Sequence, residues 1–335
     1  MLKNLANPIK YGYSTGRVKI LETRLLGKPR LERLIAAKDL GEQLHILAET
    51  DYGAFFGDVT SETELEVALH RYLSRVYAFL EEVTPDRYLN DFFRLKYDYH
   101  NVKALIKVRY LEEISEIFSG LGKFDVDEIE GLIANERFEE LPPVYRPAVK
   151  EAVSKFKEKK DPQIIDIVLD KSLFQGLFRL ASFQKNRFLV ELVQILIDLA
   201  NLKVFLRAKK LKKDKLFLQE VLVDKGSIEK ETLVELFDEP LGHFYTQMEK
   251  TRYNLLLKDT AVDEKIDLTY FDREADNFQL NFIKRAKYVT VGIEPLVGYI
   301  LARENETKML RIIFKAKFAE LPVPQIEARV RELYV

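Results

Sequence analysis

Residues 87–111, RYLNDFFRLKYDYHNVKALIKVRYL, and residues 187–211, RFLVELVQILIDLANLKVFLRAKKL, are two copies of one segment, offset by 100 positions without a gap. Apolar residues recur in both copies at spacings of 3, 4, 3 and 4, which place them on one face of an α-helix. A period this long exceeds the roughly 20–50 residues of a solenoid unit, so it indicates a copied helical domain. The apolar positions are Phe92, Leu95, Tyr99, Val102 and Ile106 in the first copy, and Leu192, Ile195, Leu199, Leu202 and Leu206 in the second.

A third, looser copy lies near the end of the chain. Residues 306–317, ETKMLRIIFKAK, align with residues 198–209, DLANLKVFLRAK, at an offset of 108. The apolar stripe persists there, but Arg303 and Thr307 interrupt it. We therefore predict an all-α fold of three similar modules, 1–114, 115–214 and 215–335. Three tandem modules can close around a pseudo-threefold axis into a funnel, although an open, curved array fits the same repeat.

Local signals support helices and mark their limits. Residues 61–64 (SETE) have the spacing of a capping box. Thr84-Pro85 and Asp161-Pro162 each place an N-cap residue before a proline suited to the first helical position. Residues 119–127 and 222–232 combine glycine with polar residues, and we predict module junctions or loops there. Upstream of the long repeat, Glu66 aligns with Asp166 at the same offset of 100.

Composition excludes several classes of function. With 53 basic and 54 acidic residues the net charge is −1, so no global field attracts nucleic acid or anionic lipid. The absence of cysteine excludes disulfides, thiol catalysis and cysteine-ligated metals. The N-terminus has no signal-peptide pattern, and no apolar stretch is long and uninterrupted enough to cross a bilayer. We expect a soluble protein that reaches a membrane only through a partner.

The sequence offers no catalytic residue, cofactor site or metal site. Residues 12–16 (GYSTG) match the nucleophile-elbow string, but that motif needs a preceding buried strand, so we interpret them as the start of a helix. The four histidines are scattered without metal-binding spacing, and no glycine-rich phosphate loop is present. Tyr52, Phe55 and Phe56 are expected in the core, the alternative being an exposed aromatic edge.

Two sets of polar residues, and the two residues that interrupt the third apolar stripe, are candidates for partner contacts. The repeated Asp, Asn and Lys of the long segments either dock their helix against neighbouring parts of the module or line a concave surface. The basic run 207–215 is either helix-end charge followed by a solvated linker, or a surface that binds anions. No aromatic residues alternate with these cations, as nucleic-acid stacking would require. The candidate contact residues are Asn101, Lys103, Asn201, Lys203, Lys209, Lys210, Lys212, Lys213, Arg303 and Thr307.

Several strings along the chain resemble one known family. The most specific are YDYHNVK at 97–103 and GIEPL at 292–296, supported by DLANLK at 198–203, by Tyr13-x-x-x-Arg17-Val18 and by Leu69-x-Arg71. Over essentially its whole length the chain resembles the C subunit of prokaryotic V-type or A-type ATP synthases, the equivalent of the d subunit of eukaryotic vacuolar ATPases. Ser-Thr-Gly at 14–16 departs from the family pattern, which affects only the local start of a helix.

The resemblance implies a funnel of three helical domains and a non-catalytic role in a central stalk. In that family this component is a socket: it receives the shaft formed by the D and F subunits, and it rests on the membrane rotor ring of c-type subunits. The complex couples ATP to transport of protons or sodium, and the socket lies peripherally on the cytoplasmic, inner face of a prokaryotic plasma membrane. A generic α-helical adaptor fits every observation except the motif strings, whereas an all-α enzyme and a nucleic-acid binder fit poorly. The coupling ion stays open.

Overall fold

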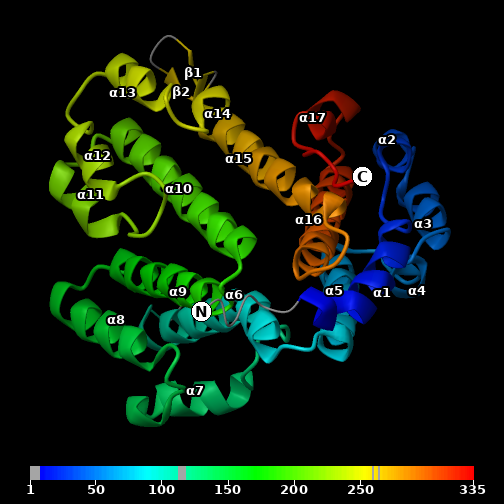
Figure 1. Ribbon diagram of the computed structural model, residues 1–335, viewed down its shortest axis with the longest axis horizontal. Helices are drawn as coiled ribbons and strands as arrows, with labels where there is room; N and C mark the ends of the chain where they lie inside the picture. The colour runs from blue at the N-terminus through cyan, green and yellow to red at the C-terminus, as the bar shows by residue number, and fades with distance from the viewer. Residues whose placement is uncertain (1–7, 112–117, 259, 263–264) are drawn as a thin grey trace. The chain divides into compact units, whose positions relative to one another are not determined.

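The computed structural model describes residues 8–111, 118–258, 260–262 and 265–335, and it confirms the all-α prediction (Figure 1). Within these residues the only strands are β1 (Ala261–Val262) and β2 (Lys265–Ile266), which form one short antiparallel pair. Helices therefore supply the framework, and all candidate contact residues except Lys212 and Lys213 lie on them.

The chain divides into two compact units, residues 1–86 with 272–335, and residues 87–271. The two ends of the chain thus belong to one unit, while both copies of the clearest repeat lie in the other. The module limits 1–114, 115–214 and 215–335 stay a prediction, and the limit at 114/115 lies outside the described residues. Helix α15 (Leu268–Ile283) runs across the division between the units.

Residues 87–271 form a helical unit around α9, which packs against α6, α8 and α10 (Figure 1). The close approach of α6 to α9 depends on Gly176, because a Cβ there would lie 2.9 Å from Leu95 Cδ2. Both copies of the long repeat are single helices, as predicted. The elements are α6 (Arg87–Leu111), α7 (Val126–Ala134), the 3₁₀ helix η2 (Phe138–Glu140), α8 (Arg146–Lys159), α9 (Gln163–Phe183), α10 (Arg187–Lys210), α11 (Lys215–Val221), α12 (Lys230–Glu235), α13 (Leu241–Met248) and α14 (Asn254–Lys258).

The other unit is built around the third copy, helix α16, which packs against α5 and α1. Fifteen of its residues are buried, among them Leu310 and Phe314 of the predicted stripe. Residues from both ends of the chain therefore share one core. The elements are η1 (Pro8–Tyr11), α1 (Gly12–Glu22), α2 (Lys28–Ala36), α3 (Leu40–Ala48), α4 (Gly53–Phe56), α5 (Glu62–Val83), η3 (Lys284–Tyr288), α16 (Glu294–Phe318) and α17 (Val323–Glu327).

The predicted helix starts are confirmed in one case and displaced in two. Ser61 caps α5 by accepting the N–H of Glu64, whose carboxylate in turn accepts the N–H of Thr60. The prediction at Thr84-Pro85 was wrong: the Thr84 N–H bonds to the carbonyl of Leu80, so this residue ends α5, and α6 begins later. The Asp161 carboxylate accepts the N–H of Gln163, where α9 begins one residue beyond the predicted proline.

Two further sequence predictions concern the unit formed by the chain ends. Tyr52 and Phe56 are buried, and the Tyr52 ring stacks on Tyr72 with centroids 4.0 Å apart, which confirms these two as core residues. Phe55 is partly exposed. Residues 12–16 open helix α1, as predicted, and the buried Ser14 hydroxyl donates to the carbonyl of Val83 at 2.5 Å. This serine is a packing residue, not the nucleophile of an elbow.

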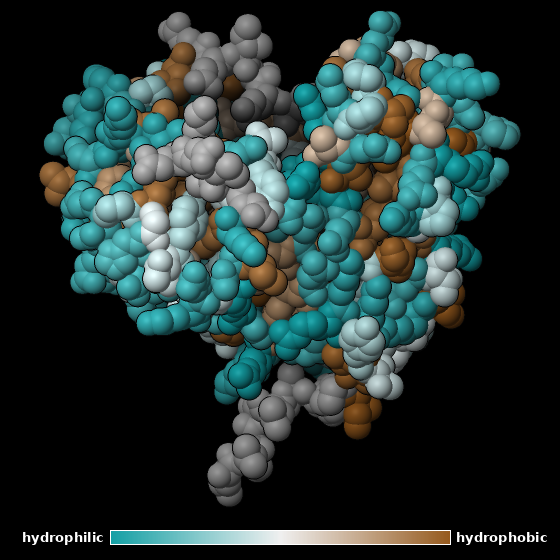
Figure 2. Space-filling model, turned by 90° about the horizontal axis from the view of Figure 1, so that it is seen from above, coloured by the Kyte–Doolittle hydropathy of each residue, from teal (hydrophilic) through white to brown (hydrophobic). Residues whose placement is uncertain are grey.

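The surface carries mainly polar and charged side chains. On the face drawn in Figure 2, hydrophilic residues cover most of the area and hydrophobic ones occur in small groups. Among the described residues, no helix combines the length and the apolar character that a membrane crossing requires.

Candidate functional site

The first polar repeat attaches helix α6 to the loop that follows it. Asp98 is buried, and its Oδ1 accepts the backbone N–H groups of Lys123 at 2.7 Å and Phe124 at 3.2 Å. Asn101 makes a two-way contact with Ser119, accepting its N–H and donating to its carbonyl, both at 2.8 Å. These side chains replace the hydrogen bonds that water would otherwise supply to the loop backbone.

Helix α10 repeats this arrangement with its own following loop. Asp198 accepts the N–H groups of Ser227 and Ile228, both at 3.0 Å, and the hydroxyl of Tyr253 at 2.7 Å. Asn201 again makes a two-way contact, here with Val223 at 2.8 and 2.9 Å. Of the two interpretations of the repeated polar residues, the docking network is confirmed. The segments predicted as loops, 119–127 and 222–232, contain the backbone groups that it holds.

In the third copy the same position binds residues from the other end of the chain. Glu306, aligned with Asp198, accepts the N–H of Leu26 and the hydroxyl of Tyr52, the latter at 2.7 Å. Tyr52 therefore does for Glu306 what Tyr253 does for Asp198. The segment around residues 24–56 precedes the first copy of the repeat in the sequence. In the structure it packs against the third copy, helix α16.

Arg303 is the feature that sets the third module apart. Its guanidinium donates to Asp51 at 2.7 Å and to Glu306 at 3.0 Å, and the side chain has no exposed surface. The aligned residues in the other copies are Leu95 and Ile195, which are apolar and buried. The interruption of the stripe is thus an internal ion cluster that joins α16 to the N-terminal segment.

In the unit of residues 87–271, glycine allows the loops after α6 and α10 to approach the buried carboxylates of Asp98 and Asp198 closely. A Cβ on Gly122 would lie 2.5 Å from Asp98 Oδ1, and one on Gly226 would clash with Asp198 Oδ1. Neither glycine has a positive φ, so steric room and not backbone conformation selects glycine here. The glycine-containing breaks in the sequence mark these two close approaches.

We expect Gly226→Ala to lower the free energy of unfolding by about 1–3 kcal/mol, because the added methyl displaces a loop that Asp198 holds from several sides. Urea unfolding followed by circular dichroism measures the loss. The matched control is Gly131→Ala in α7, where a Cβ meets nothing within 4 Å; we expect it to gain about 0.5–1 kcal/mol from higher helix propensity. Equal effects at the two glycines would contradict the close-approach explanation.

A second repeated contact is a set of ion pairs between long helices. Lys103 of α6 lies 2.6 Å from Asp170 and 3.4 Å from Asp166 of α9, and Lys107 lies 3.1 Å from Asp166. In the other unit, Arg311 and Lys315 of α16 lie 2.9 and 2.8 Å from Glu66 of α5. The sequence contained this signal in the alignment of Glu66 with Asp166, but the cations were not assigned to these acids.

The basic run at the end of α10 divides into anchored and exposed cations. Lys209 donates to the carbonyl of Glu239 at 2.5 Å, just as the aligned Lys317 donates to the carbonyl of Ala37 at 2.6 Å. Lys210 is exposed but donates to the carbonyl of Ile266 at 2.9 Å. Lys212 and Lys213 are exposed. Part of the run therefore binds the backbone of later segments, the loop before α13 and strand β2, which the helix-end interpretation did not foresee.

Burial narrows the set of predicted contact residues. Asn101, Asn201, Arg303 and Thr307 are all at least 96% buried and hydrogen-bonded within their own unit, so they do not form a surface for a partner. This corrects the sequence-based choice, which took repetition and divergence as signs of contact. The partly exposed candidates are Lys103, Lys203 and Lys209, and the exposed ones are Lys210, Lys212 and Lys213.

Asp98 provides a pH-dependent element in this network. Burial raises its pKa to about 6 from 3.8, against the opposing effect of the Phe124 and Lys123 N–H groups. Between these two values the closed loop binds more protons than the opened one. Its stability is therefore greatest below pH 4, falls as the pH rises to 6, and is constant above that.

We expect the loop at 119–124 to open more easily at pH 7 than at pH 4.5, with a free-energy change of about 2 kcal/mol. Hydrogen exchange of the Lys123 and Phe124 amides, corrected for intrinsic rates, measures it. Asp98→Asn cannot titrate and should remove the pH dependence. A wild-type profile as flat as that of the variant would contradict the assignment.

No group of three or more His, Asp or Glu side chains in the described part of the chain has the geometry of a metal site. The buried polar groups described above all hold backbone or each other. The chemistry of the site is thus structural: it fixes short helices and loops against three long helices.

Comparison with known proteins identifies the family to which this chain is similar. A sequence model described as ATP synthase (C/AC39) subunit matches residues 14–329. The chain belongs to this family. The match spans both compact units and all three long repeats, so the family resemblance inferred from the motif strings is confirmed over nearly the whole chain.

Named relatives of the family cover most of the chain at low identity. The V-type sodium ATPase C subunit of Enterococcus hirae is 24% identical over 93% of this chain and 95% of its own length. The A-type ATP synthase C subunits of Thermococcus onnurineus and Methanocaldococcus jannaschii are 25% and 26% identical, over 91% and 95% of this chain and 86% and 85% of their own lengths.

Proposed function

We propose that this chain is a non-catalytic coupling component in the central stalk of a V-type or A-type rotary ATPase. It acts as a socket that receives the shaft of the D and F subunits and rests on the membrane rotor ring. The observation that carries the proposal is the family match over residues 14–329, together with relatives that are named as subunits of ATPases and ATP synthases. In this role the chain lies peripherally on the inner face of the plasma membrane.

The polar networks support the proposal physically. A socket that transmits torque has to resist deformation, and loops that are fixed by buried carboxylates open at a high energetic cost. The repeated hydrogen-bond networks at Asp98, Asp198 and Glu306 support this requirement in all three copies of the long helix. We therefore propose that the buried polar residues make the chain rigid. Exposed cations, such as Lys210 and Lys212, are the proposed contacts with acidic residues of the ring or the shaft.

Coupling is tested with membrane vesicles from a strain that lacks this chain. We expect the soluble head to hydrolyse ATP without driving ion uptake, and purified chain to restore uptake. Vesicles that pump protons or sodium equally well without the chain would contradict the coupling role. The ion that is taken up also identifies the transport specificity of the complex.

A further inference from the structure

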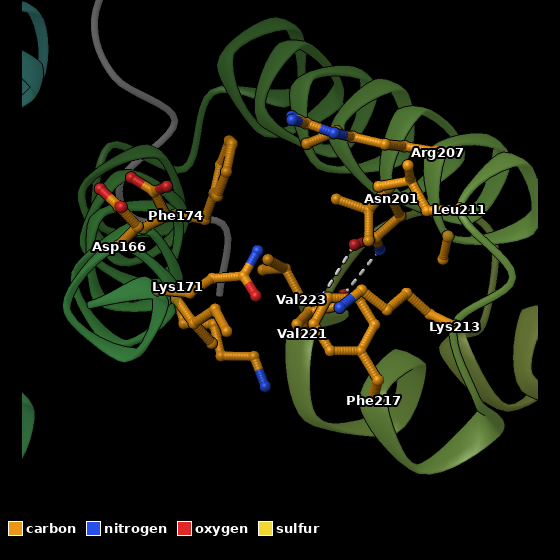
Figure 3. Close-up of a pocket in the computed structure, with 16 residues that line it drawn as sticks. Asp166, Lys171, Phe174, Asn201, Arg207, Leu211, Lys213, Phe217, Val221 and Val223 are labelled. Carbon is orange, nitrogen blue, oxygen red and sulfur yellow. Dashed lines mark hydrogen bonds between the residues drawn. The ribbon is translucent and has the colours of Figure 1, made fainter. Parts of the chain in front are cut away.

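The unit of residues 87–271 contains a groove between α9 on one side and α10 with α11 on the other (Figure 3). Its volume is about 440 Å³. Partly exposed apolar side chains from all three helices line it. They include Ile167 and Phe174 of α9, Val204 of α10, Leu211, and Phe217 and Val221 of α11.

Charge on the two sides of the groove is unequal. On the α9 side, Asp166 and Asp170 are already paired with Lys103 and Lys107 of α6. On the opposite side, Arg207 extends from α10 and Lys213 lies beside the Phe217 ring, 5.3 Å from its centroid. The charge of the groove that remains uncompensated is therefore positive.

Comparison of the three copies of the repeat shows that Arg207 differs from its aligned counterparts in its ion pairing. Its aligned counterparts, Lys107 and Lys315, each pair with an acid on a neighbouring helix, at 3.1 and 2.8 Å. Arg207 occupies the same position, is exposed, and has no side-chain partner among the residues that the structure describes. In the first and third copies a carboxylate of the same chain pairs with the cation at this position. In the second copy the cation, Arg207, lies instead at the edge of an apolar groove.

We propose that this groove docks an acidic amphipathic helix of a partner protein. Carboxylates of that helix pair with Arg207 and Lys213, and its aliphatic face enters between α9 and α11. This is the helix-in-groove mode of recognition, with apolar anchors for affinity and flanking charges for selectivity. The inference goes beyond the socket function and does not depend on it, because the groove belongs to one unit of this chain.

The test uses the full-length chain and a fluorescein-labelled helical peptide of about 18 residues, long enough to form a helix. The peptide carries leucines at spacings of 3 and 4 and glutamates on both flanks; a second peptide has lysine at every glutamate. We expect saturable binding of the glutamate peptide below about 1 mM, weaker at high salt, and weaker binding of the lysine peptide.

Variants locate the binding. We expect Arg207→Glu/Lys213→Glu to weaken binding of the glutamate peptide at least about tenfold, and Leu211→Ser to weaken its binding about threefold. The matched control is Lys28→Glu/Lys38→Glu, which changes the net charge equally at exposed sites outside the groove and should bind as wild type. Equal binding by the groove variant and the control, preference for the lysine peptide, or no saturable binding would each overturn the proposal. Capture of the shaft or the ring is a separate measurement, so the two proposals fail independently.

Discussion

Replacing Arg303 by leucine, the residue type found at the aligned position 95, is expected to lower the free energy of unfolding of the unit formed by the chain ends by about 3–5 kcal/mol. The substitution leaves the carboxylate of Glu306, 2% exposed, without its cation, and Asp51 loses its contact at 2.7 Å. Breaking a buried ion cluster by removing one member is costly because the desolvated charge of the other remains.

Circular dichroism during urea unfolding, with hydrogen exchange of residues 24–56, measures this loss. The control is Arg24→Leu, which removes an exposed cation 3.8 Å from the same Asp51 and should cost less than about 1 kcal/mol. The double variant Arg303→Leu/Glu306→Gln has no buried unpaired carboxylate and should recover part of the loss. If Arg303→Leu cost no more than Arg24→Leu, the internal role of this arginine would be refuted.

The second large effect is expected for Asp198→Ala in α10. The substitution leaves four donors without this acceptor: the N–H and hydroxyl of Ser227, the N–H of Ile228, and the hydroxyl of Tyr253. Each unsatisfied buried donor costs about 1–3 kcal/mol, partly offset by water entry, so we expect a loss of about 3–5 kcal/mol.

Urea unfolding gives the total loss, and hydrogen exchange should show lost protection at residues 223–228. Asp198→Asn keeps one acceptor oxygen and should lie between wild type and alanine. Asp214→Ala provides the control within the same unit: it removes only the exposed cap of α11 and should cost about 1 kcal/mol. Intact protection of 223–228 in Asp198→Ala would show that the carboxylate does not hold the loop.

The sequence predicted the helical framework because its signals are local. Apolar residues at helical spacing identified α6, α10 and most of α16, and identical residues at an offset of 100 identified the first two as copies. The polar positions were found for the same reason. Asp98, Asn101 and their counterparts stand out in an alignment of the chain with itself, whatever their role.

The role of these residues could not be predicted, because it follows from contacts between residues that are far apart in the sequence. Arg303 looked like a surface feature because its partner Asp51 lies 252 positions away in the chain. Glycines 122 and 226 indicated loops, but their closeness to a carboxylate requires the folded backbone. The contacts of Glu306 with Leu26 and Tyr52 were hidden for the same reason, since these residues lie at opposite ends of the sequence.

In the proposed role this chain joins a rotary shaft to a membrane ring. The most direct test of that role is affinity capture from native membranes with the tagged full-length chain, followed by mass spectrometry of the bound proteins. We expect the D and F subunits and the ring protein to be recovered together, and purified D–F complex to bind the chain alone. Recovery of neither shaft nor ring, with the chain folded, would contradict the coupling role and favour a different helical adaptor function.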